Sequence, residues 1–312
     1  MAAIDRSLHM ARKPGFLVAG TAKAGTTSMA QYLSQHPGIE IPRKESFFFN
    51  SDEFVSNSLP YPMQRLRQDI VRTREDYEAL YWQSEASLLG EVGTGYLYHY
   101  KEAIPKIKAV LGSDVPVLIV LRNPVERAYS AYMHFKKDCF EKVSFTEALE
   151  IERHRIEQHW DFMWHYKAMG FYYEQVRAYL ENFDRVQVCF FEDLKRDPKA
   201  FMKPIFHSLE LDPFNGPMGP GKNPSGEARF PWLQRLITHE NPIKQMLRPI
   251  VRTVFSSERR SALRKGLKAR NLKPSEGMLP ETRAELASLY KRDVLRLSDL
   301  LKKDLTHWTY VA

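Results

Sequence analysis

The stretch "FLVAGTAKAGTTSMAQYL", residues 16–33, decides the fold. A short apolar run ends at Gly20, a loop of small residues follows, and the rest has the pattern of a helix. Gly20 and Gly25 have almost the spacing of a phosphate-binding loop, G-x-x-x-x-G-K-[ST]. Here Thr26 occupies the lysine position, and the lysine lies three residues earlier, at Lys23. A strand, a glycine turn and a helix start together bind anions through backbone N–H groups, so we predict an anion site.

Continuous apolar runs elsewhere in the chain predict further buried strands. They are "LLGEV" (88–92), "VPVLIVL" (115–121) and "VQVCFF" (186–191). Such runs, without polar alternation, are typical of parallel strands covered on both faces. Helical patterns lie between them at 26–35, 101–111, 124–137, 145–158 and 168–182. The alternation predicts an α/β fold, a central parallel β-sheet flanked by helices in a P-loop-like arrangement.

The chain of 312 residues has no linker rich in Pro, Gly and Ser that would divide it. We therefore expect a single domain over residues 1–312, with 1–14 as a flexible N-terminal segment. The C-terminal third contains a loop, a basic helical region and an amphipathic helix, at 212–231, 243–273 and 280–302.

Composition narrows the class of protein. An apolar content of 43% and a charged content of 27% describe a soluble globular chain. No run of about 18 apolar residues could span a membrane, and no signal-peptide core is visible, so we expect a cytoplasmic protein. Cys139 and Cys189 are too few for a disulfide scaffold. The net charge of +8 favours anionic small molecules, polyanions or acidic membrane surfaces.

Two features argue against a kinase of the P-loop type. Such an enzyme needs its loop lysine, here Thr26, and an acidic residue after a nearby strand to hold Mg²⁺. The strand at 115–121 ends instead in Arg122. Positive charge supplied by the protein suits a nucleotide with phosphates at both ends and a transferable group that requires no metal. A P-loop small-molecule kinase and a non-catalytic basic module for nucleic acid or membranes remain the alternatives.

Motifs along nearly the whole chain resemble the sulfotransferases that use 3′-phosphoadenosine-5′-phosphosulfate (PAPS), in their bacterial and heparan-sulfate-type branch. "GTAKAGTTS" (20–28) is similar to the family's 5′-phosphosulfate loop, and "VLRNPVERAYSAYMH" (120–134) to its 3′-phosphate motif. Four further segments resemble the family in the same order: "HPGIEIPRKESFFFN" (36–50), "FFEDLKRDP" (190–198), "NPSGEARF" (223–230) and the tail 279–308. The resemblance implies a PAPS-dependent sulfotransferase.

The resemblance also implies which residues bind the cofactor, with no metal. Lys23 would contact the 5′-phosphosulfate and stabilise charge on the leaving oxygen. Arg122 and Ser130 would bind the 3′-phosphate, Arg122 through its two-pronged guanidinium. Lys222 and Arg229, on a late loop, would either close over the nucleotide or be plain surface charges. The 5′-phosphate would be bound by Ala24, Gly25, Thr26, Thr27 and Ser28.

Glu45 aligns with the glutamate that is the general base in heparan-sulfate-type members. Apolar surroundings strengthen a carboxylate as a base, and three phenylalanines follow it, at 47–49. The competing interpretation is a surface glutamate paired with Arg43 or Lys44. His99 is the alternative base. Val92 stands where the family often has a lysine, which leaves charge neutralisation to Lys23.

The expected reaction transfers a sulfuryl group to a hydroxyl, or less readily to an amine. The acceptor would be a small molecule such as a natural product, or a sugar. We expect no nucleic-acid partner and no stable membrane insertion. The basic stretch 248–273 is interpreted as the solvated face of a helix, in preference to a site for an anionic acceptor or lipid.

Overall fold

The computed structural model describes residues 12–54, 70–212, 214, 216, 227–239, 256–275 and 277–310. Its centre is a five-stranded sheet in the order β2-β3-β1-β4-β5, and every pairing in it is parallel. The strands are β1 (Phe16–Gly20), β2 (Ile39–Glu40), β3 (Leu88–Val92), β4 (Val117–Leu121) and β5 (Val186–Phe190). The prediction of an α/β fold with a central parallel sheet is confirmed.

The strand ends differ from the predicted ones for local reasons. β4 begins at Val117 because the preceding residue, Pro116, has no N–H to donate to a neighbouring strand. β5 ends at Phe190, since Phe191 opens the helix α9 (Phe191–Arg196). β2 was not predicted, because two residues carry no periodic signal.

Most of the predicted helices are confirmed, namely α1 (Thr26–Leu33), α4 (Tyr100–Leu111), α5 (Pro124–Lys137) and α14 (Pro280–Leu301). The single helix predicted over 145–158 is wrong: Ile151 separates α6 (Phe145–Glu150) from α7 (Glu152–Glu157). The helix predicted over 168–182 is also divided, into the 3₁₀ turn η4 (Ala168–Gly170) and α8 (Tyr173–Asn182). Here the Tyr172 and Tyr173 N–H groups donate to Asp293 on α14, at 2.8 and 3.2 Å, which caps α8 from outside its own chain segment.

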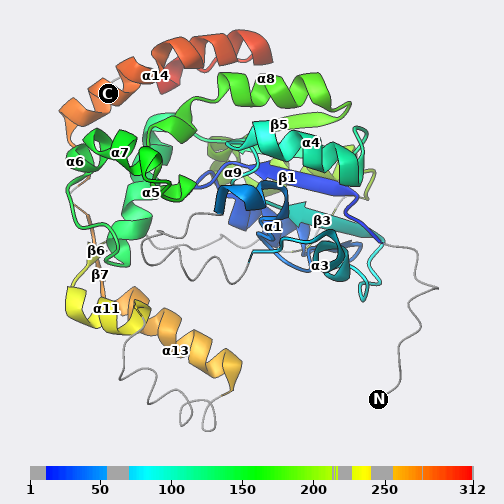
Figure 1. Cartoon of the computed structure of the whole chain (residues 1–312), viewed down its shortest axis with the longest axis horizontal. Helices are drawn as coiled ribbons and strands as arrows, with labels where there is room; N and C mark the ends of the chain where they lie inside the picture. The colour runs from blue at the N-terminus through cyan, green and yellow to red at the C-terminus, as the bar shows by residue number, and fades with distance from the viewer. Residues whose placement is uncertain are drawn as a thin grey trace.

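Both faces of the sheet are covered. On one face Leu17 and Ile119 pack in the cluster that includes α4, α8 and α14. On the other, Val18 and Val120 pack against α1 and α10 (Pro198–Ser208). Figure 1 shows α4, α8 and α14 on one side of the sheet and α1 on the other. The double covering explains why the strands are continuous apolar runs.

A smaller unit adjoins the end of α5. The strands β6 (Glu227–Ala228) and β7 (Leu272–Lys273) pair antiparallel, next to the helices α11 (Pro231–Thr238) and α13 (Ser257–Arg270). In Figure 1 this unit lies at one end of the molecule, beyond α5. Within the described ranges, no helix has the length and apolar character needed to cross a bilayer.

Candidate active site

The loop between β1 and α1 lies at the carboxyl end of the sheet, where parallel α/β folds bind their ligands. Gly25 has a φ of +91°, and a Cβ there would lie 2.7 Å from the Phe191 ring, so a glycine is required. No side chain caps the start of α1. Its first N–H groups are therefore oriented for an anion, beside a cavity of about 750 Å³ that Thr26, Thr27 and Ser28 line.

Lys23 lines the same cavity and has a left-handed backbone, with a φ of +70°. Burial, together with the positive charges of Lys137 and Arg122, lowers the pKa of its amino group to about 8, against a smaller opposite effect of Glu45. A lysine with this pKa loses its proton at mildly alkaline pH. The negative charge of a bound polyanion would raise the pKa and keep the amino group protonated.

Arg122 directly follows β4, and its side chain contacts the loop between β1 and α1. Its Nη1 donates to the Lys23 carbonyl oxygen at 3.1 Å, and its guanidinium lies 4.8 Å from the centre of the Phe191 ring. Burial lowers the pKa of Arg122. The distance between Arg122 and Glu126 is long for an ion pair, 3.9 Å, and Glu126 lies 2.5 Å from Arg283. Ser130 lines the cavity two turns into α5.

Glu45 lines the same cavity, in a second left-handed turn with a φ of +64°. Its N–H donates to the Val92 carbonyl at 2.8 Å, and Lys44 is bridged to Val92 as a strand partner would be. The Glu45 side chain is 29% exposed, and its carboxylate contacts the Lys44 amino group. Only Phe47 of the three phenylalanines lines the cavity, while Phe48 and Phe49 turn into the core.

His99, the alternative base, is not among the residues that line the cavity. Its Nδ1 lies 3.3 Å from a Glu53 oxygen, and its ring packs edge-on against Phe162, at 5.3 Å between ring centres. Phe162 itself lines the cavity and so lies between His99 and the open space.

Sequence reasoning missed several titratable side chains on the cavity wall. His134 and Lys137 follow Ser130 on one face of α5, and this spacing of three to four residues was the signal that could have found them. Burial, with Lys23 and Lys137 nearby, lowers the pKa of His134 to about 3, so the imidazole is neutral. Burial raises the pKa of Asp161 to about 6, although its carboxylate accepts from the Met163 N–H at 2.8 Å.

Two of the remaining predicted residues, Ala24 and Arg229, are not among those that line the cavity. Ala24 has its side chain fully buried in the core below the loop, which leaves only its backbone for a ligand. Arg229 is exposed, and its N–H donates to the Asn271 carbonyl at 2.7 Å. Lys222 lies outside the described residues. These positions stay predictions.

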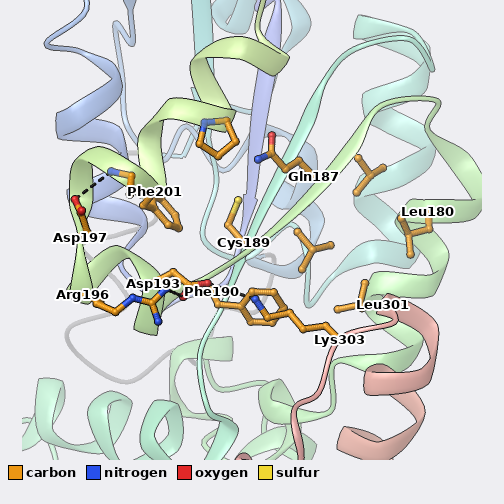
Figure 2. A pocket seen from close by; sticks show the side chains of 14 residues that line it. Leu180, Gln187, Cys189, Phe190, Asp193, Arg196, Asp197, Phe201, Leu301 and Lys303 are labelled. Carbon is orange, nitrogen blue, oxygen red and sulfur yellow. Dashed lines mark hydrogen bonds and ion pairs between the residues drawn. The ribbon is translucent and has the colours of Figure 1, made fainter. Parts of the chain in front are cut away.

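A second hollow, of about 590 Å³, lies beside β5 and the helices α9 and α10. Figure 2 shows Phe190, Asp193, Arg196 and Lys303 together at one end of it, and Cys189 nearer its middle. The ammonium group of Lys303 lies 4.1 Å from the centre of the Phe190 ring. The hollow shares no lining residue with the cavity, and we assign it no role in the chemistry.

Comparisons with known proteins agree with this arrangement. The family model described as "Sulfotransferase domain" matches residues 13–218. A sulfotransferase structure from Alicyclobacillus acidocaldarius superposes with a TM-score of 0.71 at 30% identity, covering 96% of this chain and all of that one. The "Membrane-associated sulfotransferase kil1" of Dictyostelium discoideum is 33% identical over 123 residues, 39% of this chain and 23% of that protein.

The human "Bifunctional heparan sulfate N-deacetylase/N-sulfotransferase 2" is 23% identical over 220 residues, which is 65% of this chain. The chain thus spans less than a quarter of the length of these two curated relatives.

Proposed function

The chain belongs to the sulfotransferase family, and from that premise we propose that it moves a sulfuryl group from PAPS to a hydroxyl group, with an amine as the second choice of acceptor. The supporting observation is that one cavity is lined by an uncapped helix start, by Lys23 and Arg122, and by Glu45. Its volume of about 750 Å³ lies within the range of about 300–1,000 Å³ for ligand pockets.

We propose that the donor's 5′-phosphate lies at the start of α1, and its 3′-phosphate between Arg122 and Ser130. The donor supplies a sulfuryl group on a good leaving group, and the protein supplies position and charge. Gly25 allows close approach of the backbone, and the hydroxyls of Thr26, Thr27 and Ser28 add donors in the first turn. Lys23, Arg122 and Lys137 supply positive charge, so the proposed reaction requires no metal.

In the proposed step the acceptor oxygen forms a bond to sulfur while the bond from sulfur to the 5′-phosphate oxygen breaks. The Glu45 carboxylate takes the acceptor's proton, and the Lys23 ammonium group stabilises the negative charge left on the phosphate oxygen. The Lys44 ammonium contacts this carboxylate. The acceptor would enter beside Phe47, Phe162 and Met163, an apolar wall suited to a small natural product or to the flat face of a sugar.

The experiment measures the melting temperature with the product nucleotide, 3′-phosphoadenosine-5′-phosphate (PAP). At about 100 times its Kd, PAP adds roughly 2.7 kcal/mol to the free energy of unfolding, and EDTA leaves the gain intact. ATP with Mg²⁺ is the control. A gain with ATP that needs Mg²⁺, and none with PAP, would favour a kinase and contradict the proposal. Labelled PAPS with a panel of alcohols, sugars and amines then identifies the acceptor.

A further inference from the structure

The positive charge of the protein is concentrated in one segment. Residues 227–275 contain twelve Lys or Arg and three Asp or Glu, a net charge of +9, whereas the whole chain carries +8. The rest of the chain therefore sums to −1. The described residues of this segment, 227–239 and 256–275, contain nine Lys or Arg and two Asp or Glu, and they form the unit of α11, α13 and the β6–β7 pair at one end of the molecule.

Part of that charge faces solvent on the described residues of the unit. Lys268 is bound to Asp138 at 3.0 Å, and Lys273 lies 3.6 Å from Glu227. Among the residues whose burial is described, five arginines are exposed: Arg229, Arg235, Arg259, Arg264 and Arg270. A surface with this excess attracts polyanions over about 10 Å at moderate salt.

Large apolar side chains are exposed on the same two helices. Trp232 is 66% exposed, Leu263 57% and Phe230 50%. Leu267, one turn after Leu263 on α13, is exposed as well. The Phe230 backbone is bound to the Asn271 side chain at 3.0 and 3.1 Å, which places it at the end of α13. Tryptophan, phenylalanine and leucine interspersed with arginine are typical of helices that lie in the surface of a membrane.

The unit is attached to the wall of the cavity. Asp138, at the end of α5, accepts from Gln234 of α11 at 2.9 Å and from Lys268 of α13 at 3.0 Å. Ser275, just after β7, lines the cavity itself. A surface that binds the unit therefore lies close to the cavity.

We propose that α11 and α13 dock the enzyme peripherally on an anionic lipid surface. Trp232, Phe230 and the Leu263 face enter the headgroup level, and the arginines bind lipid phosphates. Nucleic acid offers phosphates too, but no apolar layer for these side chains. Docking needs neither donor nor acceptor, so it is independent of the proposed reaction.

The test is co-sedimentation of the full chain with phosphatidylcholine vesicles, with and without about one-third phosphatidylglycerol. We expect binding only to the anionic vesicles. We expect Trp232→Ala to weaken vesicle binding about tenfold, because apolar area that would be buried is lost, and Arg264→Gln to weaken it about fivefold, because one positive charge is lost. The matched controls are Trp82→Ala, on a residue 42% exposed after α3 (Arg74–Ala79), and Arg292→Gln on α14, both of which bind as the parent does.

Three results would overturn the inference. The first is an absence of binding to anionic vesicles. The second is binding that salt abolishes and that Trp232→Ala leaves unchanged, because this is adsorption by charge alone. The third is tighter binding to duplex DNA or RNA than to vesicles. PAP affinity, measured on each variant, should equal the parent's and shows that the variant is folded.

Discussion

The lowered pKa of Lys23 predicts how nucleotide affinity changes with pH. In the free protein the amino group has a pKa of about 8. If PAP binds with its 5′-phosphate against Lys23, the added negative charge returns this pKa toward the usual value of about 10.5. Binding then includes uptake of one proton wherever the free lysine is neutral.

The size of the effect follows from these two values. Below pH 8 the lysine is charged in both the free and the PAP-bound protein, so its titration does not change the affinity for PAP. Above pH 8 affinity falls, approaching tenfold per pH unit, and levels off near pH 10.5. Between pH 7 and 9.5 the predicted loss is about 30-fold, or about 2 kcal/mol. Asp161 and His134, with pKa values of about 6 and 3, titrate below this window.

The assay is titration calorimetry with PAP at intervals from pH 7 to 9.5, in buffers of different ionisation enthalpy to count the proton taken up. Lys23→Arg is the matched control, since arginine stays charged throughout and its profile should be flat. Lys23→Met should bind weakly at pH 7, and equally weakly at pH 9.5. A parent profile as flat as that of Lys23→Arg, or a Lys23→Met profile as steep as the parent's, would refute the reasoning.

Two further predictions concern the other site residues. Arg122→Ala should weaken the binding of PAP by a few kcal/mol more than the binding of adenosine 5′-phosphate, which lacks the 3′-phosphate, because a charge-assisted contact is lost. Equal losses of binding free energy for the two nucleotides, measured by calorimetry, would mean that Arg122 does not bind the 3′-phosphate. Glu45→Gln should lower turnover with labelled PAPS by about 10²–10⁴-fold and leave PAP affinity nearly unchanged, since the carboxylate faces the acceptor. His99→Ala, with His99 behind Phe162, should keep its turnover, and the reverse result for the two variants would contradict the assignment of the base.

The features that could be predicted from the sequence are those that depend on neighbours along the chain. β1 and β3 have the predicted bounds, because continuous apolar runs predict strands covered on both faces. The loop at 20–28 was predicted from the spacing of its glycines, and Gly25 does have a positive φ. The helix α5 begins at Pro124, with the Asn123 side chain capping it, a signal local to the sequence.

Only the tertiary structure decided what shares the cavity. Arg122 donates to the carbonyl of Lys23, 99 residues away in the sequence, and the Glu45 N–H donates to the Val92 carbonyl. The sequence could not separate Glu45 from His99 as the residue facing the cavity, because the position of the Phe162 ring depends on a distant segment. In the same way the start of α8 is capped by Asp293, a residue that lies more than a hundred positions later in the sequence. Strands and turns follow from contacts between neighbours in the chain, whereas a site follows from the order in which strands pack, and no local pattern records that order.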